Sequence, residues 1–350
     1  KRNMTKKTDR HEKLRQNVNF ISEDQTFMKA INAKRASVIR TGFGNIDNIL
    51  GGGLTNTLYV LGSETSTGKT AIMTTFAKNA AEQDVDVFYF ALEMNKIELY
   101  ARGIAAESYK NSLKDKKCHS YTIEDIIFQK IDYSEYEIYN KSYFEKHKTI
   151  CIIDQDTAGS IGGYSAQDVY DTVKGYEFAH PDRRIMVVVD YLQYLKPECL
   201  SATDKQSTDA AIRILKGLSS TMPVIAASSY SRKNYGGGSS TESYKESGNI
   251  EYTGGILIGW DWNGFTDVKS RQERKETEQL CNERGYREMT FSVLKNRNGK
   301  RGAHANLLYY PEFDYFEEAK EAELRANTLR DSKSKRKKDF STNEKKYTYV

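Results

Sequence analysis

The sequence predicts an α/β fold: a mostly parallel central sheet, helices on both of its faces and an antiparallel hairpin near the C-terminus. Three observations support this prediction. Short apolar, β-branched runs recur through the middle of the chain, amphipathic segments lie between them, and an Asn298-Gly299 pair separates the last two runs. Several runs are continuously apolar, which is typical of strands buried on both faces of a parallel sheet. The alternation of strands with helices favours a doubly wound domain.

The expected strands follow from these runs, and an Asn-Gly pair between the last two is a strong hairpin signal. In chain order they are Thr57–Leu61, Val85–Leu92, Thr149–Ile153, Ile185–Val189, Val224–Ala227, Ile256–Ile258, Met289–Leu294 and Ala303–Tyr310. The expected helices are Lys69–Gln83, Thr122–Tyr133 and Ala210–Ser219. The first helix is the clearest, because Ile72, Phe76 and Ala80 recur every four residues and form one apolar stripe.

Composition excludes several protein classes. The chain has 350 residues, of which 29% are charged, and no stretch approaches the roughly 18 apolar residues of a membrane span. The first residues are basic, but the apolar stretch of a secretory signal does not follow them, so we expect a cytoplasmic protein without membrane contact. The cysteines are too widely spaced for a disulfide framework or a zinc site, and we expect them to be reduced: Cys118, Cys151, Cys199 and Cys281.

Charge is distributed unevenly along the chain. The net charge is +5, but residues 1–40 carry +7 and residues 325–350 carry +6, so the body between them carries −8. A globally basic surface is therefore excluded. Any binding to nucleic acid is expected to use local cationic elements or the ends of the chain.

Three regions follow from these patterns: a basic N-terminal arm over residues 1–40, a body over 41–318 and a basic, disordered tail over 319–350. Within the arm, a capping box that begins at Ser22 predicts a linker helix over Glu23–Ala36. This helix packs either on its own domain or on a neighbouring subunit, and the sequence leaves both options open.

Two segments of the body do not fit a plain connection. The Gly-, Ser- and Tyr-rich stretch Ser228–Asn249 is expected to be either a functional loop or a disordered one. Residues 264–288 are dense in both charge signs and are expected to form an exposed insertion.

A phosphate-binding loop is predicted where the segment LGSETSTGKT joins the first strand to the clearest helix. Backbone N–H groups of such a turn point at an anion, Lys69 adds a fixed cation, and Thr70 places a hydroxyl on Mg²⁺. Ser63 occupies the first position of the motif G-x-x-x-x-G-K-[ST], with Gly62 one residue earlier. The residues expected to hold the nucleotide are Ser63, Glu64, Thr65, Ser66, Thr67, Gly68, Lys69 and Thr70.

Carboxylates that could serve a bound nucleotide stand at strand ends. Asp190 ends the most apolar strand, at the sheet edge where ligands gather in open α/β folds, and is the candidate for the metal. Asp154 ends another strand in the same way and competes for this role. Glu93 terminates Val85–Leu92, a strand that we expect near the P-loop strand, and is the candidate base. Its alternative role is an acid favoured by a helix dipole.

The order of motifs resembles the RecA-like motor domain of DnaB-type replicative helicases over about residues 41–311. RadA-like and KaiC-like ATPases share the P-loop and the approach at Gly51–Leu54 but match the other segments less well. The resemblance rests on TSTGKT at Thr65–Thr70, ALEM at Ala91–Met94, VVVDYLQYL at Val187–Leu195, PVIAASSYSR at Pro223–Arg232, ESGNIE at Glu246–Glu251 and KNRNG at Lys295–Gly299.

The resemblance implies an ATP- and Mg²⁺-dependent DNA helicase that forms a homo-oligomer, a hexameric ring, and moves along single-stranded DNA. It implies that Glu93 is the catalytic glutamate, that Lys69 and Thr70 are the P-loop pair and that Asp190 directs Mg²⁺. Arg102, nine residues after Glu93, matches an arginine close to the nucleotide base.

The resemblance also implies residues that act outside the chain's own nucleotide site. Lys295 and Arg297 match a K-x-R pair that reaches into the next subunit's site, where a cation would stabilise charge on the transferring phosphoryl group. DNA contacts are expected to be sequence-independent and salt-sensitive. The resemblance implies Lys245, Glu246 and Gly248 for these contacts. Residues nearby in the sequence could stack on or steer the strand, or could be incidental to a mobile Gly- and Ser-rich loop: Arg232, Lys233, Tyr230, Tyr235 and Tyr244.

Two departures from the family pattern leave alternatives. Ser229 stands where the family usually carries a glutamine that senses the γ-phosphate, and only about forty residues precede the motor. A short form, as in a phage, plasmid or mobile-element helicase, fits the second departure, with a primase, loader or initiator as partner. The alternative function is an ATPase of this fold that acts as a nucleotide-dependent assembly or regulatory protein and does not unwind DNA.

Overall fold

The computed structural model describes residues 37–319, apart from 156–162, 198–200, 231–234, 236–237, 245–254, 264–270 and 298. Its helices are α3 (Gly44–Ile49), α4 (Lys69–Ala81), α5 (Lys96–Lys114), α6 (Ile123–Ile127), α7 (Tyr133–Lys146), α8 (Ala166–Ala179), α9 (Asp204–Leu218) and α11 (Arg271–Arg284). Its strands are β1 (Leu58–Ser63), β2 (Asp86–Ala91), β3 (Ile150–Asp154), β4 (Ile185–Asp190), β5 (Val224–Ser229), β6 (Ile256–Trp262), β7 (Arg287–Asn296), β8 (His304–Tyr310) and β9 (Tyr315–Glu318).

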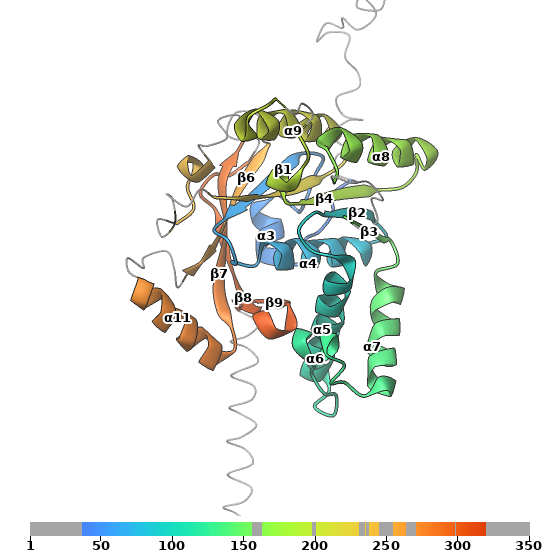
Figure 1. The fold of residues 1–350 in the computed structure, drawn as a ribbon, viewed down its shortest axis with the longest axis vertical. Coiled ribbons are helices and arrows are strands. Elements are labelled where there is room, and N and C mark those ends of the chain that lie inside the picture. The colour runs from blue at the N-terminus through green and yellow to red at the C-terminus, as the bar shows by residue number, and fades with distance from the viewer. Residues whose placement is uncertain are drawn as a thin grey trace, which may run out of the picture. The chain divides into compact units, whose positions relative to one another are not determined.

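The strands form one nine-stranded sheet in the order β3-β2-β4-β5-β1-β6-β7-β8-β9 (Figure 1). The pairs from β3 to β6 are parallel, and the pairs from β6 to β9 are antiparallel. The predicted fold class is therefore confirmed. One expectation about strand order is wrong, because β4 and β5 separate β2 from the P-loop strand β1.

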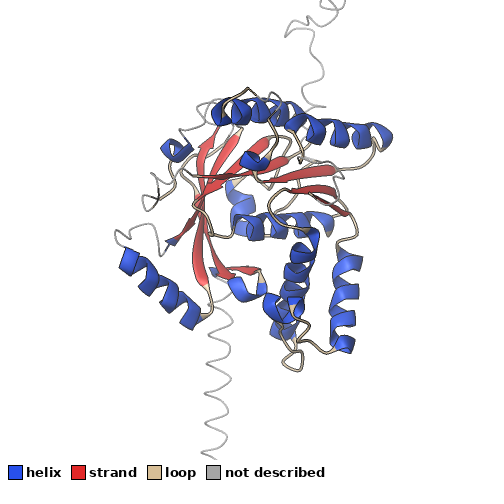
Figure 2. Ribbon diagram, viewed as in Figure 1, coloured by secondary structure: helices blue, strands red, loops and turns tan. Residues whose placement is uncertain are grey.

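Helices cover both faces of the sheet (Figure 2). In β1, Leu58 and Val60 pack with α8 and α9, whereas Tyr59 and Leu61 pack on the other face with α3 and α4. Successive side chains of a strand point to opposite faces, so a strand covered on both sides must be apolar throughout. The helices α5, α6 and α7 have a separate small core of their own.

The helix predictions were partly wrong. The helix at Lys69 is confirmed, and α9 begins six residues earlier than expected because Thr203 and Gln206 form a capping box. The helix expected over Thr122–Tyr133 is broken: α6 ends at Ile127, Gln129 is left-handed with a φ of 54°, and Asp132 caps α7. The sequence reading missed six elements, namely α3, α5, α7, α8, α11 and β9.

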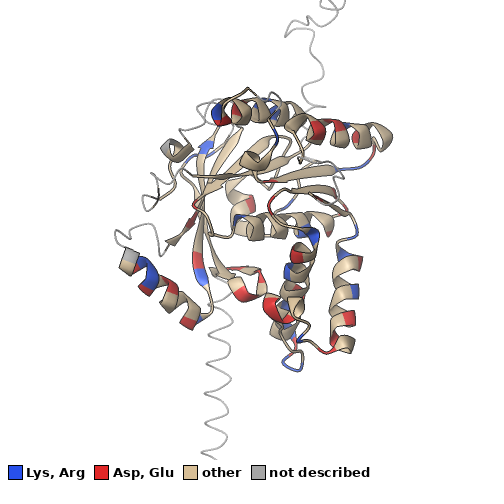
Figure 3. Cartoon of the chain, viewed as in Figure 1, with Lys and Arg blue, Asp and Glu red and all other residues tan. Residues whose placement is uncertain are grey.

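The charged segment 264–288 contains α11, which carries both charge signs along its length (Figure 3). Among the helices that the structure describes, none combines the length and apolar character needed to cross a membrane. The three described cysteines are free, whereas Cys199 lies outside the described residues. The predicted linker helix Glu23–Ala36 and the tail beyond residue 319 also lie outside them.

Candidate nucleotide-binding site

The P-loop lies at the carboxyl end of β1 and leads directly into α4. Two of its residues adopt left-handed backbone conformations, Ser66 with a φ of 61° and Gly68 with a φ of 86°. Glycine suits the second position because a Cβ there would also lie 3.2 Å from the ring of Tyr309. Such a turn directs successive N–H groups toward one point, which is the geometry of an anion-binding nest.

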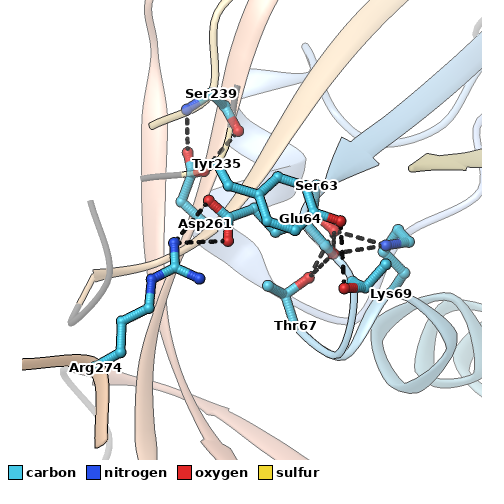
Figure 4. A network of polar contacts seen from close by, with 9 residues as sticks. Ser63, Glu64, Thr67, Lys69, Tyr235, Ser239, Asp261 and Arg274 are labelled. Carbon is cyan, nitrogen blue, oxygen red and sulfur yellow. Dashed lines mark hydrogen bonds and ion pairs between the residues drawn. The ribbon is translucent and has the colours of Figure 1, made fainter. Parts of the chain in front are cut away.

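Hydrogen bonds inside the loop hold Lys69 in place (Figure 4). The Lys69 ammonium donates to the Ser63 hydroxyl at 3.1 Å and to the Glu64 carbonyl oxygen at 2.7 Å. Ser63 and Thr67 share a hydroxyl–hydroxyl bond of 2.6 Å, and Ser63 is fully buried. The serine at the first motif position is thus accommodated, since its hydroxyl anchors the lysine.

Gly62, the residue before the motif, is required for a different reason. A Cβ at this position would lie 2.2 Å from the Tyr244 hydroxyl oxygen and 2.4 Å from the ring of Tyr230. The glycine makes room for these two tyrosines.

Burial lowers the pKa of Lys69 to about 8, against the opposing pull of Asp190, Glu93 and Glu64, whose negative charges favour the ammonium. The unfolded chain therefore binds more protons than the folded one between about pH 8 and 10.5. It follows that the cost of burying this ammonium shrinks as pH rises through that window.

ATP affinity is expected to fall above pH 8, because only the protonated Lys69 attracts phosphate. With a pKa of about 8 for Lys69 in the free protein, the dissociation constant for ATP should be about tenfold larger at pH 9 than at pH 7. Calorimetry in two buffers of different ionisation enthalpy should report proton uptake on binding at pH 8.5. An affinity that is constant from pH 7 to 9 would contradict this prediction.

The arrangement of Thr70 and Asp190 fits a metal that accompanies a nucleotide. The Asp190 carboxylate accepts hydrogen bonds from Thr70 and, at 3.0 Å, from the Tyr89 hydroxyl. Its Oδ1 atom is buried and has no partner among the described residues, and burial raises its pKa above the ordinary value. Among the described residues, no group of three or more His, Cys, Asp or Glu side chains is arranged to hold a metal ion. A Mg²⁺ here would therefore rely on phosphate oxygens and water as further ligands.

Asp154, the competing candidate, serves another role. It lies on β3, at the edge of the sheet, and its Oδ2 accepts a hydrogen bond of 2.9 Å from the backbone N–H of Lys96 in the first turn of α5. The structure therefore favours Asp190 over Asp154 for the metal.

A pocket of about 390 Å³ opens over the P-loop. It brings together three residues that the sequence reading nominated outside the loop, namely Glu93, Arg102 and Ser229. It also contains residues that sequence reasoning missed: Met94, Tyr191, Arg287 and Tyr309. The Arg287 guanidinium stacks 4.4 Å from the centre of a Trp262 ring and donates to the Ser66 carbonyl oxygen at 3.4 Å. Nothing near Arg287 in the sequence points to this position.

Lys295 and Arg297 do not line this pocket. Lys295 pairs with Leu257 on β6. The residue that follows Lys295 lies level, across β6, with Tyr59 of β1, and Tyr59 precedes Ser63 by four residues. Four residues of strand span about 13 Å, and the P-loop lies at the carboxyl end of β1. Lys295 and Arg297 therefore lie toward the opposite, amino end of the parallel strands.

The residues proposed for DNA are only partly described. Arg232, Lys233, Lys245, Glu246 and Gly248 lie outside the described residues. Tyr230 and Tyr244 are 5% and 3% exposed, so their assignment as stacking surfaces is wrong. Both belong to the core: the Tyr244 hydroxyl donates to the Ile258 carbonyl oxygen at 2.7 Å, and the Tyr230 hydroxyl donates to Ser239 at 2.8 Å.

Two segments distant in sequence contact the P-loop from the side (Figure 4). The Tyr235 hydroxyl donates to the Thr65 hydroxyl at 3.3 Å. Arg274, on α11, contacts both carboxylate oxygens of Glu64, at 3.0 and 3.3 Å. Tyr235, which lies between the proposed DNA contacts in the sequence, and the charged insertion therefore both contact the P-loop.

Comparison with known proteins identifies a family and a fold. The family described as "DnaB-like helicase C terminal domain" matches residues 38–318. The "Replicative DNA helicase DnaB" of Mycoplasma genitalium is 26% identical over 278 residues, which cover 76% of this chain and 53% of the relative. The "Replicative DNA helicase DnaC" of Bacillus subtilis is 26% identical over 292 residues, 79% of this chain and 56% of the relative. The chain thus spans about half the length of these relatives.

Solved structures share the fold. A structure titled as an "ATPase Domain" has a TM-score of 0.65 and 21% identity, and the match covers 86% of this chain and 99% of that chain. A structure titled for a DnaB-like replicative helicase and its interactions with primase also has a TM-score of 0.65, with 20% identity over 86% of this chain and 67% of that one.

Proposed function

The chain belongs to the DnaB-like helicase C-terminal domain family, and from this premise we propose that it is an ATP-dependent DNA helicase motor that translocates on single-stranded DNA. In this proposal it hydrolyses ATP with Mg²⁺ at the subunit interfaces of a ring, a hexamer. A helicase motor role follows from the family. The ring, the interfacial hydrolysis and the DNA track are the proposed part.

The nucleotide pocket supplies the parts that phosphoryl transfer to water requires. The P-loop N–H groups and Lys69 would hold the phosphates, while Thr70 and Asp190 would hold Mg²⁺, which neutralises charge that develops on the phosphate oxygens. Glu93 is exposed at the pocket wall and would orient and deprotonate the attacking water. Catalysis in such a site consists mostly of positioning and electrostatic stabilisation.

One observation carries the assignment to a ring: Lys295 and Arg297 lie away from the pocket of their own chain. A cation that stabilises the transferring phosphoryl group must come close to it, so this pair could act only on a neighbouring subunit's nucleotide. Such a head-to-tail contact closes into a ring when the rotation between subunits permits.

Single-stranded DNA is the proposed track. The basic residues proposed to contact it, Arg232, Lys233 and Lys245, flank Tyr235, which meets the P-loop at Thr65. This contact offers a direct route by which DNA bound to the loop would affect the nucleotide site. We also propose a primase, loader or initiator as partner, and the arm over residues 1–40 and the tail over 319–350 as accessory regions around the motor over 41–318.

The proposal is tested by ATP hydrolysis with and without single-stranded DNA, in the wild type and in Arg297→Ala. The substitution should abolish DNA-stimulated hydrolysis and leave ATP binding within about twofold, because the pocket of the same chain is intact. Arg301→Ala, which removes an exposed arginine from the same turn, is the matched control and should keep full activity.

Mixing inactive variants tests whether Arg297 acts in trans. When Lys69→Ala and Arg297→Ala subunits are combined in equal amounts, about a quarter of random interfaces should pair an intact P-loop with an intact Arg297. The rate of ATP hydrolysis should therefore recover to about a quarter of the wild-type rate. No recovery in mixed oligomers, with each variant still assembling, would exclude the trans role.

A second function, nucleotide-dependent assembly without unwinding, is favoured by Ser229. This residue lines the pocket where the family resemblance expects a glutamine. The nearby Gln193 amide is not a substitute in this conformation, since it donates to the Ser228 hydroxyl at 3.1 Å. ATP-dependent rings or filaments that fail to separate any duplex would support this second function.

A further inference from the structure

Asp314 is a fully buried carboxylate that sits beside the nucleotide pocket. It ends the short 3-10 turn Pro311–Phe313 in a left-handed conformation with a φ of 49°, just before β9. Its Oδ1 atom accepts hydrogen bonds from the Arg102 guanidinium at 3.1 Å and from the Tyr309 hydroxyl at 3.2 Å. Burial of a carboxylate costs free energy unless the group is paired, so Arg102 and Tyr309 stabilise Asp314 in this position.

Both partners of Asp314 lie at the candidate nucleotide pocket. Arg102 and Tyr309 line the pocket over the P-loop, and Arg102 keeps 25% of its side chain exposed, whereas the Asp314 side chain has no exposure. The carboxylate thus lies behind the arginine, on the side away from the pocket. A guanidinium has five N–H donors in a fixed plane, so anchoring one end sets the direction of the others.

A second cavity lies on the other side of Asp314. It has a volume of about 230 Å³, and its wall includes Asp314 and the buried Lys78 of α4. The Asp314 Oδ2 atom has no hydrogen-bond partner among the described residues, and the charges of Lys78 and Asp314 attract each other. Lys78 therefore places a second positive charge beside Asp314, in addition to the Arg102 guanidinium.

We propose that Asp314 is a positioning residue for the nucleotide: it holds the Arg102 guanidinium, together with Tyr309, in the orientation that contacts a bound nucleoside triphosphate. This inference rests on the proposed function, since it assumes that a nucleotide occupies the pocket. The competing explanation is a purely structural ion pair that ties α5 to the C-terminal strands.

The test is a double-mutant cycle in the full chain with a fluorescent ATP analogue as the probe. Asp314→Asn, of nearly the same shape, should weaken nucleotide binding and raise KM about tenfold, with kcat within about threefold, because a charge-assisted contact is lost. In the Arg102→Ala background, Asp314→Asn should add less than about twofold, since its effect acts through the arginine.

Two further variants keep the cycle decisive. Asp86→Asn breaks another ion pair of a buried aspartate, with Arg183 at 2.6 Å at the opposite end of β2, and should leave nucleotide affinity unchanged. Tyr309→Phe removes one hydrogen bond from Asp314 but leaves its charge, and should weaken binding about twofold to threefold only while Arg102 is present. If Asp314→Asn does not fold, the Tyr309→Phe cycle decides.

The inference is overturned if affinity stays within twofold of wild type while the melting temperature drops, or if the effects of the Arg102 and Asp314 substitutions add. Its failure is distinguishable from failure of the proposed function. In the first case the wild type still binds ATP and loses it with Lys69→Ala. In the second case the wild type shows no DNA-stimulated hydrolysis and no strand separation, and the double-mutant cycle still reports on Arg102 and Asp314 as long as the wild type binds ATP.

Discussion

Lys69→Ala is expected to lower ATP hydrolysis by about 10²–10³-fold or more and to remove measurable ATP binding, with or without DNA. The substitution takes away the cation that faces the phosphates and the two hydrogen bonds, to Ser63 and to the Glu64 carbonyl, that hold the loop around it. Steady-state hydrolysis and equilibrium binding of a fluorescent ATP analogue measure both effects.

Stability should behave differently from activity in this variant. Burial lowers the pKa of Lys69, so the folded protein bears a cost for keeping the ammonium charged near neutral pH, and alanine relieves that cost. The melting temperature should therefore be retained. Lys141→Ala, which removes an ammonium whose side chain is 77% exposed on α7, is the control and should change neither property. Normal hydrolysis by Lys69→Ala would refute the assignment of the P-loop.

Glu93→Gln is expected to reduce kcat by about 10²–10⁴-fold and leave ATP affinity within about twofold. Glutamine keeps the size of the side chain and its ability to accept a hydrogen bond, but it cannot take a proton from water. Single-turnover hydrolysis, measured beside nucleotide binding, separates the chemical step from affinity.

Asp154→Asn is the matched control for Glu93→Gln. It also neutralises a carboxylate at the end of a strand of the same sheet, yet Asp154 lies outside the pocket and binds the first turn of α5. Hydrolysis should stay within about threefold of wild type. If Asp154→Asn were as inactive as Glu93→Gln, the choice of Asp190 over Asp154 for the metal would be wrong.

Much of the fold could be predicted because its signals are local. Each parallel strand is buried on both faces and is therefore marked by a continuous apolar run, and the turn at residues 61–70 carries its own motif. Helices without a long apolar stripe were missed. In α8, for example, the buried residues are Val169, Val173 and the first residue of the helix, which is too few to form a clear stripe. A different local signal was present, because capping boxes at Asn95 and Ser165 mark the starts of α5 and α8.

The rest of the site depends on how strands that are distant in sequence pair in the sheet, which no local pattern encodes. The position of β2, which two other strands separate from β1, is a matter of topology. Arg287, Tyr309 and Asp314 reach the P-loop region because β6 pairs with β1 and the following strands fold back beside it. Tyr230 and Tyr244 looked like surface aromatics in a polar loop, yet they fill the space that Gly62 leaves.

ATP-dependent separation of a forked duplex by the purified chain tests the central claim most directly. The motor proposal predicts that single-stranded DNA stimulates hydrolysis and that wild-type protein separates the fork, whereas Lys69→Ala and Arg297→Ala do not. Rapid ATP turnover that is indifferent to single-stranded DNA, with no strand separation at any protein concentration that supports assembly, would contradict it.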